Sequence, residues 1–198
     1  KKIYGEEDSR YIIALNNLSN IYSETGDYNK ALELYLKGIK LAEKVWGKEH
    51  SNYMLYLSNL STVYSYLGNN SKALELEVEC LALREKVLGK EHPDYAESLN
   101  NLAVMYSDLK DHIKALKLHL ECLALREKIF GKEHPDYIMS LSNLSRVYSD
   151  LGNYNKALEL DLKYLSFIEK IYGKEHPDYV RSLNNLALLY KALWDHEK

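Results

Sequence analysis

Apolar residues recur along this chain at the three- and four-residue spacing of an α-helix. Leu15, Leu18 and Tyr22 are separated by three and four residues, which places all three on one helix face. The same triplet returns as Leu57, Leu60, Tyr64; Leu99, Leu102, Tyr106; Leu141, Leu144, Tyr148; and Leu183, Leu186, Tyr190. The pattern predicts five amphipathic helices of one kind.

A second helical segment follows each of the first four helices. It carries Lys-Ala-Leu-x-Leu at residues 30–34, 72–76, 114–118 and 156–160. The alanine of this motif is small enough for two helices to cross closely there. Each unit is therefore predicted to be a hairpin of two antiparallel helices.

The whole pattern repeats every 42 residues. The segment Gly89–Tyr95 recurs at 131–137 and 173–179, with weaker copies at 47–53 and 5–11. A fixed period of this size is typical of a solenoid, in which each unit buries its apolar face against its neighbours. We therefore assign one continuous domain, cut from a longer array, in these parts: the end of a preceding repeat at 1–7, four repeats at 8–49, 50–91, 92–133 and 134–175, and the first helix of a fifth at 176–198.

Local signals mark the ends of the first helices. Proline of the His-Pro-Asp segment suits the first helical position, and the aspartate after it favours the helix dipole. Gly26, Gly68 and Gly152 stand where a helix ends on a left-handed residue. Lys110 and Trp194 occupy the same position in the third and fifth units. A lysine held at positive φ costs roughly 1 kcal/mol, unless the turn differs.

Composition and charge narrow the classes of partner. Apolar residues make up 46% of the chain and charged residues 28%, as in a folded globular protein. The formal net charge of −3 offers no general attraction to nucleic acid or acidic membranes. No apolar run approaches the roughly 20 residues that span a bilayer. We therefore expect neither a nucleic-acid nor a membrane partner.

Two cysteines, Cys80 and Cys122, lie one period apart at equivalent positions. Equivalent residues of stacked repeats are separated by a helix-packing distance of roughly 8–10 Å, which is too long for a disulfide. We interpret them as buried small residues in a reducing compartment. This predicts an intracellular, cytoplasmic protein.

Four histidines invite a metal-binding interpretation, but each belongs to a different loop between repeats: His50, His92, His134 and His176. Metal ligands must converge on one ion, so we expect these residues to pack against or cap the helix starts instead. A glycine-rich phosphate loop, a Cys-x-x-Cys pair and a nucleophile elbow are all missing from the sequence. We predict no enzyme activity, no metal and no cofactor.

The spacing of the small residues resembles the tetratricopeptide repeat. Ser19, Ser61, Ala103, Ser145 and Ala187 are each followed by a tyrosine three residues later, and in the four full repeats by an alanine nine beyond that. The 42-residue period and the Leu-Arg-Glu-Lys-x-x-Gly-Lys-Glu-His-Pro-Asp segment are similar to the variant found in kinesin light chains. The resemblance implies an all-α, right-handed superhelical solenoid of antiparallel helix hairpins. It also implies a concave groove, lined by the first helices, that holds a peptide.

The resemblance places one asparagine of every first helix in this groove: Asn17, Asn59, Asn101, Asn143 and Asn185. Asparagine costs about 0.5 kcal/mol relative to alanine inside a helix, so its fivefold repetition breaks a local rule. Its amide both donates and accepts hydrogen bonds and matches a peptide main chain. Alternatively, the same amides join adjacent repeats and fix their stacking. Both roles remain open.

Three further rows on the same helix face are predicted to set specificity. They read Asn20, Thr62, Val104, Arg146, Leu188; Ile13, Leu55, Glu97, Met139, Arg181; and Glu24, Tyr66, Asp108, Asp150, Ala192. We take Asn20, Arg146, Arg181, Tyr66 and Asp108 as candidate ligand contacts. Kinesin light chains bind acidic motifs with several basic groove residues, whereas these rows hold only two arginines and set two aspartates beside them.

One substitution sets the fourth unit apart. The position occupied by Gly38, Cys80 and Cys122 becomes Tyr164 there. A tyrosine cannot fit the same helix crossing without rearrangement, so we expect the fourth unit to be splayed or specialised.

Three functions fit these observations. The first is a non-catalytic module that binds a peptide or partner protein in the groove. The second is an architectural array that self-associates end to end. The third is a sensor or regulatory domain of a larger signalling protein. The sequence does not identify the ligand.

Overall fold

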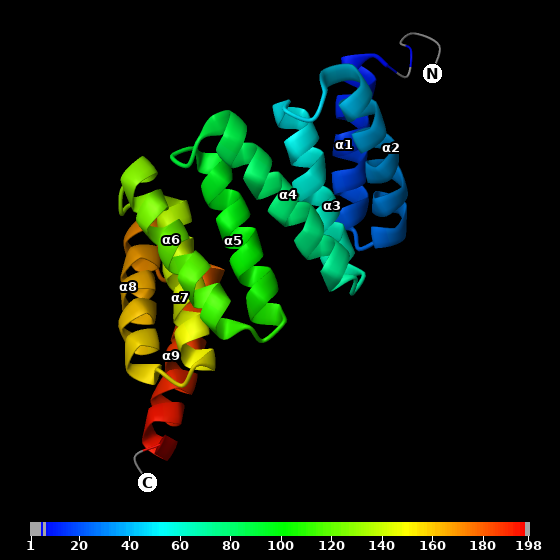
Figure 1. Ribbon diagram of the computed structural model, residues 1–198. Helices are drawn as coiled ribbons and strands as arrows, with labels where there is room; N and C mark the ends of the chain where they lie inside the picture. Colours follow the sequence, from blue (N-terminus) through cyan, green and yellow to red (C-terminus); the bar gives the residue numbers. More distant parts are fainter. Residues whose placement is uncertain (1–4, 6, 197–198) are drawn as a thin grey trace. The chain divides into compact units, whose positions relative to one another are not determined.

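The computed structural model describes residues 5 and 7–196, and within them every regular element is an α-helix (Figure 1). The helices are α1 (Ser9–Glu24), α2 (Tyr28–Trp46), α3 (Ser51–Tyr66), α4 (Asn70–Leu88), α5 (Pro93–Asp108), α6 (His112–Phe130), α7 (Pro135–Asp150), α8 (Tyr154–Tyr172) and α9 (Pro177–His196). The predicted all-α class is confirmed. The segment 1–7, assigned to a preceding repeat, lies mostly outside the described residues.

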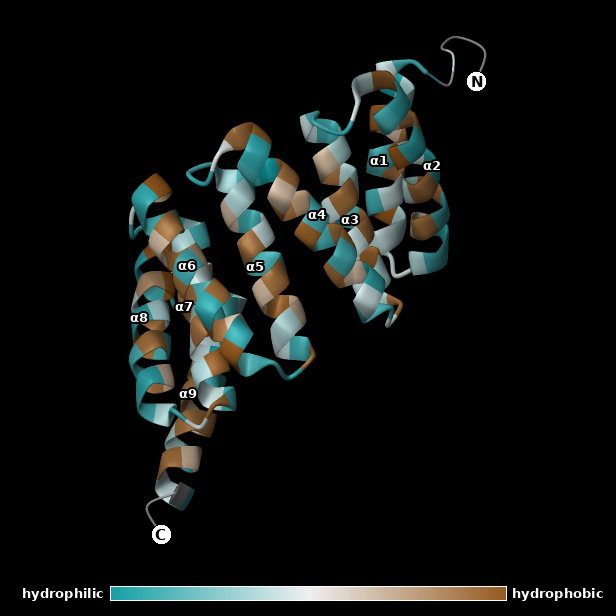
Figure 2. Cartoon of the chain, in the orientation of Figure 1, coloured by the Kyte–Doolittle hydropathy of each residue, from teal (hydrophilic) through white to brown (hydrophobic). Residues whose placement is uncertain are grey.

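The chain divides into two compact units, residues 1–98 and 99–198. In the first unit α1 packs on α2, α2 on α3 and α3 on α4; in the second, α6 packs on α7, α7 on α8 and α8 on α9. Polar and apolar residues alternate around each helix (Figure 2). Every described helix is too short or too polar to cross a membrane.

The loop histidines cap the first helices, as predicted. In His50, His92, His134 and His176, Nδ1 accepts the backbone N–H two residues later at 3.1–3.2 Å. Three of the rings also stack on the aromatic residue that ends the preceding helix, with centroids 4.2–5.0 Å apart. In each loop Nδ1 is therefore the acceptor that caps the start of the first helix.

The turns after the first helices hold left-handed residues. Gly26, Gly68 and Gly152 have φ values of 82°, 77° and 75°, as predicted for residues that end a helix. Lys110 adopts φ 65° at the same place, so the third turn keeps its shape and strains a lysine. Trp194 lies inside α9, because this helix continues to His196.

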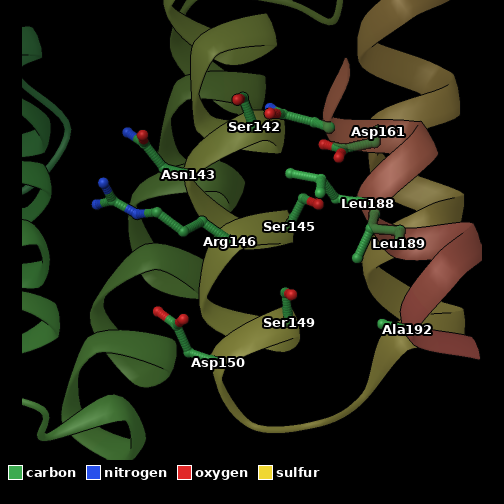
Figure 3. Close-up of a pocket in the computed structure, with 11 residues that line it drawn as sticks. Ser142, Asn143, Ser145, Arg146, Ser149, Asp150, Asp161, Leu188, Leu189 and Ala192 are labelled. Atoms are coloured by element: carbon green, nitrogen blue, oxygen red, sulfur yellow. The ribbon is translucent and has the colours of Figure 1, made fainter. Parts of the chain in front are cut away.

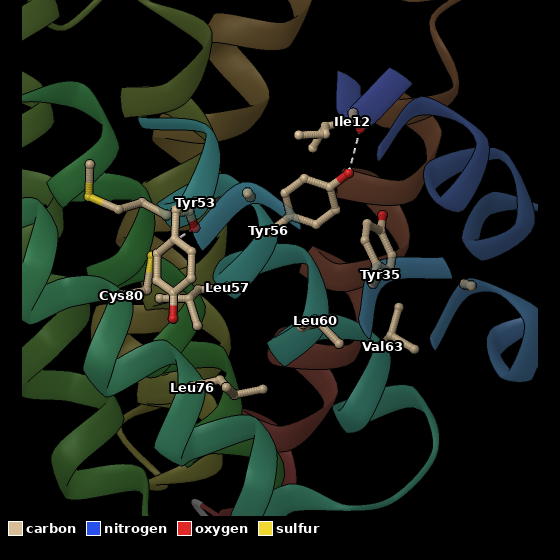
Figure 4. Packing of buried hydrophobic residues seen from close by; sticks show 12 residues of the cluster. Ile12, Tyr35, Tyr53, Tyr56, Leu57, Leu60, Val63, Leu76 and Cys80 are labelled. Atoms are coloured by element: carbon tan, nitrogen blue, oxygen red, sulfur yellow. Dashed lines mark hydrogen bonds between the residues drawn. The ribbon is translucent and has the colours of Figure 1, made fainter. Parts of the chain in front are cut away.

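In the first unit the core is built around tyrosines at the junction of α2 and α3 (Figure 4). A Cβ placed on Gly38 would lie 2.3 Å from the ring of Tyr56, so only glycine fits that crossing. The Tyr56 hydroxyl donates to the carbonyl oxygen of Ile12 at 2.6 Å, which satisfies a polar group inside the core. Tyr35 packs edge-on against the same ring.

In the second unit Tyr164 occupies the core instead of disrupting it. It is 8% exposed and belongs to the cluster of Tyr137, Ile138 and Leu141. The residue that faces Gly38 in the first unit is a tyrosine, whereas the corresponding residue of α9 is Ser182. At the junction of α8 and α9, the aromatic ring therefore comes from α8 and the small residue from α9. At the junction of α2 and α3 the arrangement is the reverse.

Two sequence expectations about buried residues have different outcomes. Cys80 and Cys122 are buried thiols and are not joined in a disulfide, as predicted, and burial raises the pKa of the Cys80 thiol to about 12. Leu18 and Leu183, which the sequence places on the apolar faces of their helices, are 42% and 44% exposed. They lie on α1 and α9, the first and last helices described.

Candidate functional site

The asparagine row forms hydrogen bonds between first helices. In the first unit, Nδ2 of Asn59 on α3 donates to Oδ1 of Asn16 on α1 at 3.1 Å and to Oδ1 of Asn20 at 3.3 Å. In the second unit, Nδ2 of Asn143 on α7 donates to Oδ1 of Asn100 on α5 at 3.0 Å. The bonds to Asn16 and Asn100 each join a row asparagine to the residue just before the row position of the preceding repeat. The geometry supports the repeat-joining role for these two residues.

The remaining members of the row differ in exposure. Asn17 and Asn185 are exposed on α1 and α9, and Asn101 is half-buried on α5. The residue before the row position is asparagine at 16, 100 and 184 but serine at 58 and 142. This alternation was the sequence signal for the hydrogen bonds, because only the asparagine offers an amide oxygen that reaches the next helix.

A polar cavity of about 360 Å³ lies between α7 and α9 of the second unit (Figure 3). Three of the predicted groove rows each contribute two residues to it. Its lining consists of Ser142, Asn143, Ser145, Arg146, Ser149, Asp150, Asp161, Asn185, Leu188, Leu189 and Ala192. Hydroxyls and amides line the α7 side, while leucine and alanine side chains of α9 provide most of the apolar surface.

Asp161 of α8 lies in this cavity, a position that the groove rows did not include. Its side chain is 4% exposed, and burial raises the pKa of its carboxyl. The Ser145 hydroxyl donates to the carbonyl oxygen of Ala157 at 3.0 Å, and its proximity to the Asp161 carboxyl partly opposes that rise. A buried carboxyl in an open cavity is the kind of group that marks a binding site.

Asp161 belongs to a row of buried polar residues on the second helices. The equivalent residues are Tyr35, Glu77 and His119, and all four are between 0% and 4% exposed. Glu77 accepts a hydrogen bond from Ser61 at 2.8 Å, just as Asp161 lies beside Ser145. The sequence signal was a polar residue recurring with the 42-residue period inside a leucine-rich helix.

The rim of the cavity carries both signs of charge. Arg146 and Asp150 are exposed on α7, and in Figure 3 both project away from α9, whereas Ser145 and Ser149 face it. Asp150 lies 3.6 Å from Nδ1 of His112 on α6. The charged groups that reach solvent are therefore separated from the carboxyl inside.

The first unit has a smaller cavity, of about 80 Å³, between α1 and α3. Its walls are largely apolar, and two of its residues, Ile13 and Leu55, come from one predicted row and are 45% and 40% exposed. Asn17 of the asparagine row also lines it. The predicted groove face is thus hollowed in each unit.

The other candidate contacts lie outside these cavities. Asn20 accepts hydrogen bonds from the hydroxyl of Tyr35 and from Asn59, so its oxygen already serves the fold. Tyr66 is 62% exposed but stacks on Tyr28, with ring centroids 4.7 Å apart.

The charged candidates also lie apart from one another. Arg181 is exposed and donates to Asp178 at 2.5 Å, and Asp108 is exposed at the end of α5. Arg181 therefore does not share a cavity with Arg146, so the two arginines do not form one basic site.

The structure consists of helix hairpins of similar length that are joined by capped turns and have cavities along their first helices. This arrangement defines an α-helical repeat protein. The sequence profile of the tetratricopeptide repeat matches residues 10–86, 78–119 and 94–170. The chain belongs to the tetratricopeptide repeat family, whose members generally act as non-catalytic protein-interaction scaffolds. No curated protein sequence matches it.

Solved structures agree with this assignment. A putative kinesin light chain of Podosopora anserina with nearly identical TPR-like repeats is 26% identical, with a TM-score of 0.79 over 94% of this chain and 88% of that one. BtubC (BKLC) from P. vanneervenii is 22% identical, with a TM-score of 0.82 over 95% and 75%. A Rap protein complexed with Competence and Sporulation Factor is 14% identical, with a TM-score of 0.73 over 92% and 49%. The last two support the fold alone; the predicted likeness to kinesin-light-chain repeats is confirmed.

Proposed function

We propose that the chain is a non-catalytic interaction module that holds a peptide or an extended partner segment against its first helices. The observation that carries this proposal is the polar cavity between α7 and α9, to which three predicted groove rows contribute. Its volume of about 360 Å³ lies at the lower end of the range typical of ligand sites, roughly 300–1,000 Å³. It suits one or two side chains of a longer segment that continues along the helices.

The amides of the row retain hydrogen-bonding capacity for a peptide. Asn143 uses Nδ2 for Asn100, which leaves its carbonyl oxygen to accept a main-chain N–H. Asn185, exposed on α9, offers both halves of its amide. The repeat-joining and ligand-binding roles are therefore compatible in the same row.

A second candidate function is self-association, and one observation favours it. Large apolar side chains are exposed on α9, including Leu188 at 67% and Trp194 at 63%. A cluster of such residues on one helix is typical of a surface that another protein covers. A second copy of the chain could provide that cover.

A peptide-display selection on the purified chain separates the two functions. Peptides bound in the cavity should lose affinity for Arg146→Ala and Asn185→Ala, since both side chains line it. Lys163→Ala removes a charge from α8 outside the cavity and is the matched control, with affinity unchanged. Failure to select any peptide, together with concentration-dependent association in ultracentrifugation, would reject the peptide-binding proposal and support self-association.

A further inference from the structure

The Asp161 carboxyl is buried without a cation to balance it. Among the described residues it forms no ion pair, and its only polar neighbour that affects it directly is the Ser145 hydroxyl. By contrast, exposed acidic residues on the second helices pair with lysine, as Glu159 does with Lys163 at 2.6 Å. A buried carboxylate without a counter-charge is unfavourable, so a cation that reaches it relieves that cost, which a surface carboxylate does not carry.

The arginine of the same cavity does not neutralise this carboxyl. Arg146 extends from α7 away from α9, as Figure 3 shows, and forms no ion pair with Asp161. Its guanidinium lies instead near His119, whose pKa it helps to lower. The cavity interior is therefore acidic, although an arginine stands at its edge.

The walls fit a long side chain that ends in a positive charge. Ser142, Ser145 and Ser149 present hydroxyl oxygens that can accept hydrogen bonds from an ammonium or guanidinium group. Leu188 and Leu189 provide an apolar wall for the methylene stem. Lysine and arginine bury their stems in this way while the charged end seeks polar partners.

We propose that the cavity between α7 and α9 is a specificity subsite for a lysine or arginine side chain of the bound segment, with Asp161 as its counter-charge. This inference rests on the proposed peptide-binding function and names the residue class that the segment must carry. Arg146, at the rim, is then free to contact the main chain or an acidic neighbour of that residue. The same cavity rejects neutral side chains of similar size, because they leave the carboxyl unpaired.

The test selects random peptides on three forms of the chain: the parent, Asp161→Asn and Glu77→Gln. Asparagine keeps the shape of aspartate and removes its charge. Glu77→Gln makes the same change at the equivalent buried position of the first unit, so it is the matched control. We expect a basic residue at one fixed position in peptides from the parent and from Glu77→Gln, and none there in peptides from Asp161→Asn.

A second measurement uses the parent protein alone and does not depend on the stability of a variant. The selected peptide is compared with a copy in which norleucine replaces its basic residue, which keeps an apolar stem without the charge. We expect the norleucine peptide to bind at least about 30-fold more weakly, as when one partner of a buried charge pair is removed.

The outcomes distinguish the subsite from the proposed function. Peptides that bind the cavity but show no basic position, or that bind equally well with norleucine, overturn the subsite and leave the peptide-binding function intact. A selection that yields no peptide on any form overturns both.

Discussion

His119 provides a quantitative test of the packing in the second unit. It is fully buried on α6, and neither ring nitrogen has a hydrogen-bond partner among the described residues. Burial, together with the guanidinium groups of Arg146 and Arg126, lowers the pKa of His119 from 6.5 to about 4. The ring is therefore neutral in the folded chain near pH 7.

The direction of the effect on stability follows from proton binding. Between pH 6.5 and pH 4 the unfolded chain holds a proton on this histidine and the folded chain does not. The contribution of the neutral His119 to the free energy of unfolding is therefore complete above about pH 6.5, and it is lost progressively as the pH decreases toward 4. The pKa difference corresponds to a total loss of about 3 kcal/mol.

The assay is urea unfolding followed by far-ultraviolet circular dichroism, for the parent chain and for His119→Leu. Leucine has a similar size and removes the titration, while all other groups titrate in both proteins and cancel in the difference. Relative to the variant, the parent should lose about 2.5 kcal/mol between about pH 7.5 and pH 4.5. Two stability curves that run parallel over this range would show that the pKa of His119 is not lowered by folding.

Substitutions at three further positions, with their controls, test local features of the fold by the same unfolding assay. Lys110→Gly should stabilise the chain by about 1 kcal/mol, because glycine accepts φ 65° without strain, and no gain would show that the lysine is unstrained. His134→Ala should cost about 1 kcal/mol through the lost cap, whereas His134→Asn should recover most of it; equal losses would argue against capping by the side chain. Gly38→Ala should cost about 1–3 kcal/mol through collision with Tyr56, and adding Tyr56→Ser should make the double variant less unstable than the sum of the two single changes.

The helices were predictable because their signals are local and repeated. The His-Pro-Asp segments and the turn glycines specify where first helices begin and end, and the caps and φ values agree with them. The exposure of Leu18 was not predictable, because periodicity identifies an apolar face but not whether another helix covers it. Tyr164 was expected to disturb the fourth unit, since the sequence does not show where its ring finds space at the junction.

The site was only partly predictable. Residues spaced along one helix face were expected to share a surface, and Asn143, Arg146 and Leu188 do line one cavity. Asp161 was missed because its helix supplies the core, and only the packing of α7, α8 and α9 places it in the wall of the cavity. The hydrogen bonds of the asparagine row were not predictable, because they depend on distances between helices of adjacent repeats. The residue pattern of one helix does not give those distances.

The central claim, that a peptide binds along the first helices, is tested most directly by nuclear magnetic resonance of the isotope-labelled chain titrated with the strongest selected peptide. Binding in the proposed site should shift the side-chain amide signals of Asn143 and Asn185 and the backbone signals of α7 and α9. These shifts should saturate together at the affinity measured for the peptide. Shifts confined to the outward residues of α6 and α8, with the two asparagines unmoved, would contradict it.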